Sequence, residues 1–318
     1  MKISEYLLEW HKSRQSLIRK TTYEGELIYI TRHLIPYFSE ACPELEDLSP
    51  LVIKRYVTYK LSGGRCDAKR GGLSLVSVKK HLAVLRQALD EAVIFGYLLS
   101  NPAAPIRLPK NKRPVTDRTV FLNVDEAQKL LDGIVSHPIY PAILIALLYG
   151  LRRSEVLGLK WSAVDFERET ISVQFTVVKN LSITEADTTK TDGSRRTFQL
   201  LPEVKDVLMQ LRSVSTPDRD YIFCRSDGRV WRPDTLLKQF QRQLARLGLP
   251  KMRFQDLRHS TASLLFDRGW SIEDVKQWLG HADIETTSNI YLHYKASRKV
   301  LMAKDLHGLF FRHLEESV

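Results

Sequence analysis

Three side chains near the carboxyl end of the sequence have the chemistry of a phosphate-diester site. Arg258, His281 and Tyr291 supply a cation, an imidazole and a phenol, and apolar residues between them can hold these groups in place. A guanidinium neutralises phosphoryl oxygens, and a phenol can attack phosphorus as a nucleophile. The three residue types therefore predict a site that acts on a phosphate diester.

Local helix signals indicate how these groups are positioned. Ser271, followed by two acidic residues, is typical of a helix start, and Gly280 is typical of its end. His281 is then expected just past the end of this helix. A further short helix, capped by a threonine, is expected to carry Tyr291.

The size and charge of the chain favour two domains and a polyanionic partner. The sequence has 318 residues, which is long for one core, and a formal net charge of +11. Such a charge favours nucleic acid as the partner, although a basic protein without such a partner has the same composition. Three scattered cysteines indicate neither a disulfide framework nor a zinc site. Without an apolar run of membrane-span length or a signal-peptide core, we expect a cytoplasmic protein.

Residues 1–103 carry apolar side chains at helical spacing without strand signals, which predicts a small helical bundle. A basic loop at 63–72, flanked by glycine pairs, contains Arg65, Lys69 and Arg70. It lacks the sequence of a phosphate-cradling loop, so we interpret it as a flexible loop that either contacts a DNA backbone or is only solvated. Three helices are predicted to begin at polar residues: at Thr21 or Thr22, at Ser49 and after Ser77.

Residues 105–118 are predicted to form a linker. Three prolines prevent regular structure there, and the stretch is rich in cations, among them Lys112 and Arg113. A tether that lies along a polyanion has this composition, whereas a plain interdomain linker would not need the cations.

The second domain is predicted to be mostly helical with one small sheet. Helices are expected from Asn123 or Asp125 onward and over 141–149, 202–211 and 236–247. Alternating β-branched and aromatic residues predict a strand over 170–178, and 188–201 is its expected partner, with a tight turn at Asp192-Gly193.

Four short patches, each a weak signal alone, occur in one order along the chain: GLRRSE from Gly150, TKTDGSRR from Thr189, FQDLRH from Phe254, and LGH from Leu279, followed by Tyr291. In this order the patches resemble the tyrosine recombinase (phage integrase) family, and the chain looks closest to integrases of phages and conjugative transposons. The resemblance covers nearly the whole chain. It implies a mainly α fold: a SAM-like helical core-binding domain, then an α+β catalytic domain with a small antiparallel sheet.

The resemblance implies a role for each matched residue. Arg152 and Arg258 would hold the scissile phosphate through charge-assisted, fork-shaped hydrogen bonds, and Glu155 would support the site from behind. Lys190 would protonate the leaving 5′ oxygen, and His281 would hydrogen-bond a non-bridging oxygen.

Tyr291 matches the nucleophile of the family, and Tyr294 is the alternative. Two nearby guanidinium groups would favour the phenolate and stabilise the transition state. A covalent phosphotyrosine keeps the bond energy of the diester, so no cofactor, metal or ATP is expected. Lys179, on the neighbouring predicted strand, is the alternative to Lys190.

One position departs from the family pattern. Gln255 stands three residues before Arg258, where the family usually has histidine. Glutamine can hydrogen-bond a phosphate or a phenol, but it cannot accept a proton near neutral pH. His259 is a poor replacement, because neighbouring residues on a helix point about 100° apart. We expect Gln255 to act as a hydrogen-bond donor.

The resemblance implies a site-specific recombinase of a phage or mobile element in a bacterial cell, working through a 3′-phosphotyrosine and a Holliday junction. Expected partners are double-stranded DNA, further copies of the chain in a homo-tetramer, and an excisionase or a DNA-bending protein. A type IB topoisomerase and a non-catalytic DNA-binding regulator are the alternatives. The implied division of the chain is a core-DNA-binding domain (1–104), the linker (105–118), a catalytic domain (119–299) and a C-terminal helix (300–318).

That C-terminal helix would dock on a neighbouring subunit or, alternatively, on its own domain. Phosphate contacts that position the protein on DNA are expected from basic residues outside the site: Arg65, Lys69, Arg70, Lys112, Arg113, Arg195 and Arg196.

Overall fold

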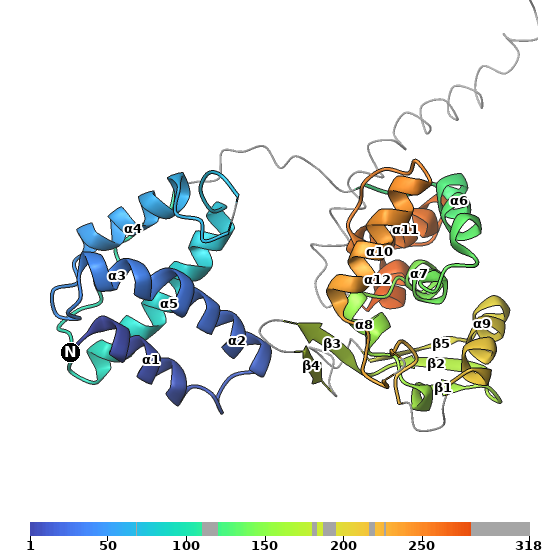
Figure 1. Ribbon diagram of the computed structural model, residues 1–318, viewed down its shortest axis with the longest axis horizontal. Coiled ribbons are helices and arrows are strands. Elements are labelled where there is room, and N and C mark those ends of the chain that lie inside the picture. Colours follow the sequence, from blue (N-terminus) through green and yellow to red (C-terminus); the bar gives the residue numbers. More distant parts are fainter. Residues whose placement is uncertain are drawn as a thin grey trace, which may run out of the picture. The chain divides into compact units, whose positions relative to one another are not determined.

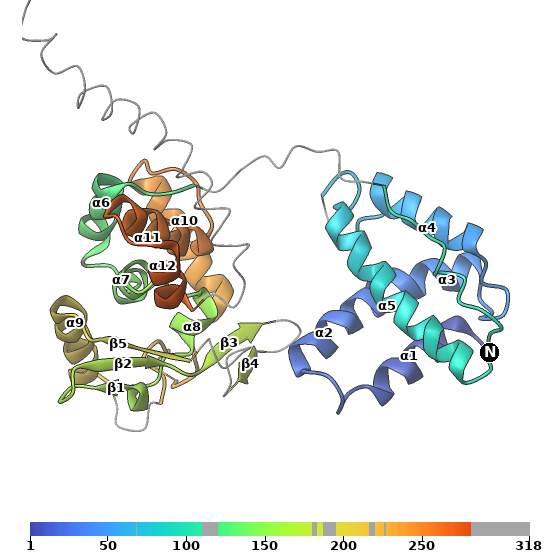
Figure 2. The same ribbon diagram turned by 180° about the vertical axis from the view of Figure 1, so that it is seen from behind.

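The computed structural model describes residues 1–67, 69–109, 120–179, 183–186, 195–215, 220–225 and 227–280, with backbone only for 179 and 183–186. These residues form two compact units, one chiefly of the residues up to 109 and the other chiefly of those from 120 onward (Figures 1 and 2). No helix in the described ranges is both long and apolar enough to cross a bilayer.

The first unit is a helical bundle, as predicted. Its helices are α1 (Ile3–Ser13), α2 (Lys20–Tyr29), the π-helical turn η1 (Ile30–Leu34), α3 (Ile35–Ala41), α4 (Pro50–Ser62) and α5 (Leu75–Ile94). Their apolar faces meet in one core around Leu34, Phe38 and Tyr56, none of which is exposed. Ser49 caps α4 as predicted, because its side chain accepts a hydrogen bond from the amide of Val52.

Two helix starts in this unit differ from the prediction. The amides of Thr22 and Tyr23 already donate to the carbonyl of Arg19, so α2 begins before the threonines that were expected to cap it. Helix α5 begins before Ser77, since the side chain of Ser74 accepts the amide of Ser77 and caps the helix there.

The described start of the stretch predicted as a linker packs against the first unit. Ile106 is buried in its core, next to the buried Ala103. Arg86 of α5 donates from Nε to the carbonyl of Ala103 (3.0 Å) and from Nη2 to the carbonyl of Ile106. These contacts make the described start of this stretch part of the first unit. Lys112 and Arg113 lie outside the described residues.

The second unit combines helices with two small sheets. Its helices are α6 (Val124–Ile134), α7 (Tyr140–Leu148), α8 (Arg153–Leu157), the 3-10 turn η2 (Trp161–Ala163), α9 (Pro202–Ser213), α10 (Pro233–Arg246), α11 (Phe254–Asp267) and α12 (Ile272–Leu279). Its strands are β1 (Val164–Asp165), β2 (Thr170–Val173), β3 (Thr176–Lys179), β4 (Ile183–Ala186) and β5 (Arg196–Gln199). Helix α7 is the apolar centre, and α6, α8, α9 and α11 pack around it.

The single strand predicted over 170–178 is wrong. Strand β2 lies between β1 and β5 in an antiparallel sheet, whereas β3 belongs to a second sheet with β4. The break falls where the chain packs on the end of α8, because a Cβ on Gly158 would lie 2.4 Å from the carbonyl oxygen of Phe175. The pairing of β2 with β5 confirms the predicted partner, and the turn at Asp192-Gly193 lies outside the described residues.

Candidate active site

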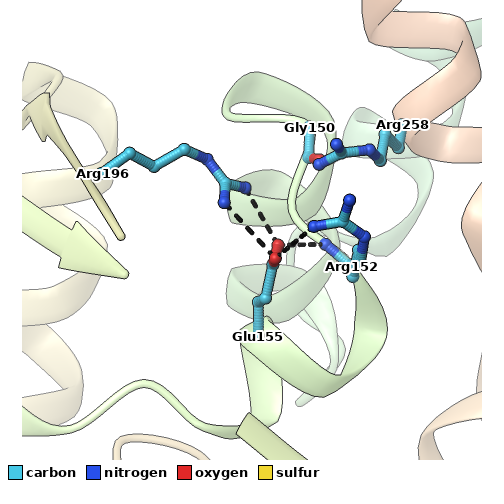
Figure 3. A network of polar contacts seen from close by, with 5 residues as sticks. All are labelled: Gly150, Arg152, Glu155, Arg196 and Arg258. Carbon is cyan, nitrogen blue, oxygen red and sulfur yellow. Dashed lines mark hydrogen bonds and ion pairs between the residues drawn. The ribbon is translucent and has the colours of Figure 1, made fainter. Parts of the chain in front are cut away.

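Three arginines and one glutamate from separate segments meet at one place in the second unit (Figure 3). Arg152 directly precedes α8, and Glu155 lies in the first turn of that helix. Arg196 begins β5, and Arg258 lies on α11. The contacts between them decide what this cluster can bind.

A glycine turn brings two of these arginines together. Gly150 follows the end of α7 with φ of +61°, a left-handed conformation that favours glycine. A Cβ at this position would lie 2.2 Å from a methyl group of Leu279. The carbonyl of Gly150 accepts a hydrogen bond from Nη1 of Arg258 at 2.8 Å, and Arg152 follows two residues later (Figure 3). The turn therefore sets the positions of both arginines.

Helix α11 is fixed at both its middle and its start. The hydroxyl of Thr261 donates to the carbonyl of Leu147 in α7 at 2.6 Å. At the start, the buried carboxylate of Asp256 accepts the amide of Arg253 (2.7 Å) and its Nη2 (2.7 Å). These contacts hold the helix that carries Arg258. Asp256 was not among the predicted site residues, although a carboxylate three residues into a helix is a signal for a capping box.

Glu155 is shared between two arginines. Its Oε1 accepts from Nη1 of Arg152 (2.7 Å) and Nη1 of Arg196 (3.3 Å). Its Oε2 accepts from the amide of Arg152 (2.8 Å) and Nη2 of Arg196 (2.9 Å) (Figure 3). Burial alone would raise the pKa of Glu155, but hydrogen bonds and charge from Arg196, followed by the charge of Arg152, bring it below its ordinary value. The residue is therefore held as a carboxylate.

Three guanidinium groups gather at this carboxylate. Among the described residues, Arg152 and Arg196 bind Glu155 directly, and Arg258 lies close by in a largely buried place (Figure 3). Burial, followed by the charge of Arg152, lowers the pKa of Arg258, and Glu155 opposes this. Several guanidinium groups at one place suit an anion with several oxygens, such as a phosphate.

One residue of the cluster, Arg152, lines a cleft. A cavity of about 950 Å³ is lined by Arg152, Arg253, Gln255 and Lys251, among others. Arg152 is one third exposed, so its guanidinium is accessible from this side. Gln255 lines the same cleft as Arg152. His259 is not among the described residues that line this cleft.

The remaining predicted site residues fall partly outside the described residues. Lys190, His281 and Tyr291 lie there, as do Tyr294 and the side chain of Lys179. Helix α12 nevertheless ends as predicted: Ser271 caps its start, and Gly280, with φ of +64°, ends it directly before position 281.

The residues predicted to contact DNA differ in their surroundings. Arg65 pairs with Asp67 through Nε (2.6 Å) and Nη2 (2.7 Å) and also donates to the carbonyl of Gly72 (3.3 Å). It therefore holds the basic loop together, whereas Lys69 and Arg70 are exposed.

Arg195 and Arg196 are neighbours with opposite surroundings. Arg195 is exposed, but the side chain of Arg196 is only 8% exposed and faces Glu155. The alternation along β5 carried a signal for this, since Arg196 shares its side of the strand with the buried Phe198.

Comparison with known proteins identifies the family. The model of the phage integrase family matches residues 120–298. A tyrosine recombinase XerC-like protein of Caldanaerobacter subterraneus is 29% identical over 75% of this chain and 68% of its own length. The integrase of Staphylococcus phage L54a is 26% identical over 68% of this chain and 70% of its own.

Solved structures share the fold at low identity. The Tn1549 transposon integrase, in complex with a circular intermediate DNA, has a TM-score of 0.73 and 19% identity over 95% of this chain and 99% of its own. A lambda integrase dimer bound to a COC′ core site has a TM-score of 0.66 and 20% identity over 89% of this chain and 96% of its own. The chain therefore belongs to the phage integrase family, whose members are tyrosine-type site-specific recombinases.

Proposed function

We propose that this protein cuts and rejoins DNA at specific sites through a 3′-phosphotyrosine intermediate, with Tyr291 as the nucleophile. The observation that carries the proposal is the meeting of Arg152 and Arg258 at one place, beside a cleft that Arg152 lines. Both groups offer planar pairs of N–H donors, which match phosphate oxygens better than an ammonium does. The open cleft gives a DNA backbone a route to Arg152, which lines it.

Each step of the proposed reaction conserves one phosphodiester. The Tyr291 oxygen forms a bond to phosphorus, the bond from phosphorus to the 5′ oxygen breaks, and Lys190 protonates the leaving oxygen. Arg152 and Arg258 stabilise the charge on the two non-bridging oxygens, and His281 hydrogen-bonds one of them. The 5′-hydroxyl of another strand then attacks the phosphotyrosine and releases the phenol.

With Gln255 at this position, the phenol must lose its proton by another route. An amide cannot accept that proton near neutral pH, so Gln255 is proposed to donate a hydrogen bond to the phosphate, and the proton passes to solvent. The two guanidinium groups favour the phenolate and thereby assist its formation. This assignment is supported by the position of Gln255 in the same cleft as Arg152.

The proposed assembly is a homo-tetramer on two DNA sites. Exchange of four strands requires four nucleophiles, and one chain offers one. A lambda integrase with the same fold was solved as a tetramer bound to a Holliday junction. Docking of 300–318 on a neighbouring subunit, and an excisionase or DNA-bending partner, stay predictions.

A suicide DNA substrate tests the proposal. Duplexes from the flanks of the gene, nicked beside the cleavage position, should trap wild type as a covalent adduct. Tyr291→Phe should form none, and Tyr294→Phe should still form it. An adduct that persists in Tyr291→Phe and disappears in Tyr294→Phe would identify Tyr294 as the nucleophile. Binding without any adduct would indicate a regulator, and relaxation of supercoils without recombination a topoisomerase.

A further inference from the structure

We propose that Arg196 is a positioning residue for strand cleavage: it holds both oxygens of Glu155, which in turn holds Arg152 at the scissile phosphate. The proposal rests on the function proposed above. It gives Arg196 a role different from the DNA contact that its sequence predicts.

The contacts of Glu155 carry this inference. Each carboxylate oxygen accepts one hydrogen bond from Arg152 and one from Arg196, so the two arginines are joined through the same two atoms. The side chain of Arg196 extends from β5 toward Glu155, on the opposite side of the carboxylate from Arg152 (Figure 3). A planar guanidinium that meets both oxygens fixes the plane of the carboxylate. The orientation of Arg152 follows from that plane.

The burial of Arg196 argues against a direct contact with the DNA backbone. Its side chain is 8% exposed, whereas Arg152 is 33% exposed and lines the cleft. The guanidinium of Arg196 also lies over the ring of Phe198, 5.4 Å from its centre. A cation in this position acts on substrate through Glu155, while the exposed Arg195 next to it remains suited to a DNA contact.

Electrostatics explain why Glu155 needs this second arginine. The carboxylate is 2% exposed, and burial favours its neutral form. Three charged side chains face it among the described residues: Arg152 at the start of α8, Arg196 on β5 and Arg258 on α11.

Within the described side chains, the elements packed on α8 bring no further charge to Glu155. Helix α7 carries no charged side chain, and neither do the described side chains of β3. The charged residues of α10, which also packs on α8, are all exposed. Removal of Arg196 should therefore raise the pKa of Glu155 and favour its neutral form, which holds Arg152 less firmly.

Single-turnover cleavage of the suicide substrate, at saturating DNA and from about pH 5 to pH 9, tests the inference. Arg196→Met should cleave about 100-fold more slowly at neutral pH, as expected when a catalytic group is misplaced. Its rate should recover partly as pH rises, because Glu155 ionises again. Arg196→Lys should lie between wild type and Arg196→Met, since an ammonium keeps the charge but not the fork.

Two further variants complete the design. Arg195→Met removes the same charge from an exposed neighbouring position and should weaken DNA binding in a salt-dependent way, with the pH dependence of wild type. Adding Glu155→Gln to Arg196→Met should cause little further loss in cleavage rate and should abolish the recovery at high pH. Both changes break the same set of contacts, from Arg196 through Glu155 to Arg152.

Three outcomes would overturn the inference. Arg196→Met could lose DNA affinity yet cleave normally at saturating DNA, as expected of a backbone contact. It could cleave equally slowly at every pH without improvement by Arg196→Lys, as expected of a purely structural role. In the double variant, the losses in cleavage rate caused by Arg196→Met and by Glu155→Gln could also be fully additive. If wild type forms no adduct, the proposed function itself fails, so the two failures are distinguishable.

Discussion

Replacing Glu155 with glutamine should destabilise the second unit by about 3 kcal/mol, the lower end of the cost of breaking a buried ion pair. Glutamine keeps the shape of the side chain but offers one acceptor oxygen, and its NH₂ group faces guanidinium donors. Arg196 then loses a buried counterion, whereas the partly exposed Arg152 recovers some hydration. For a unit of this size the melting temperature should fall by about 6–12 °C.

The position of Glu126 provides a matched control. Glu126 occupies the same place in the first turn of α6, where its carboxylate accepts the amide of Asn123 at 3.0 Å. Glu126→Gln changes the same chemical group in a capping box and should cost less than about 1 kcal/mol.

Urea unfolding followed by tryptophan fluorescence measures both variants. Four of the five tryptophans lie in the second unit, at positions 161, 231, 270 and 278, so the signal reports mainly on that unit. Equal midpoints for wild type, Glu155→Gln and Glu126→Gln would refute the reasoning, since the shared carboxylate would then contribute no stability.

The effect of Glu155→Gln should also depend on pH. The folded-state pKa of Glu155 lies below its ordinary value, because Arg196 and Arg152 outweigh the effect of burial. A group with a lowered folded pKa contributes stability above the unfolded pKa and loses it as pH falls through the folded value. The difference between wild type and Glu155→Gln should therefore be full at neutral pH and shrink below about pH 4.

Three other substitutions test separate parts of the site. Gly150→Ala forces a Cβ into a left-handed turn and onto Leu279, so unfolding by urea should show a loss of about 2 kcal/mol or more; an unchanged midpoint would show that the turn relaxes freely. Gln255→His should speed cleavage of the suicide substrate by about tenfold or more above the ordinary histidine pKa near 6.5; an unchanged rate would mean that glutamine is a neutral replacement there. Arg258→Lys should slow cleavage about 100-fold or more at saturating DNA. An ammonium cannot both donate to the Gly150 carbonyl and hold a phosphate oxygen in the same geometry. Adduct formation at the wild-type rate would show that Arg258 does not bind the phosphate.

Local sequence signals predicted much of the helical structure. The capping residues Asn123, Ser49 and Ser271 mark helix starts as expected, and Gly280 marks a helix end. Such signals operate within one turn of the chain, so neighbouring residues suffice to reveal them. The prediction failed at residues 170–178, where the strand divides because the chain packs against the end of α8. That contact is between segments distant in sequence and leaves no local pattern.

The order of the four patches was sufficient to identify the family and to name Arg152 and Arg258 as candidate site residues. Strand alternation places Arg195 and Arg196 on opposite sides of β5, but only the tertiary structure decided which partner Arg196 binds. Arg195 and Arg196 are the same residue type at adjacent positions, yet one is exposed and the other is bound to Glu155, 41 positions earlier. Charge is visible in a sequence, but the partner that neutralises it depends on how β5 and α8 pack together. The meeting of Arg152, Arg196 and Arg258 at Glu155 is therefore a property of the fold.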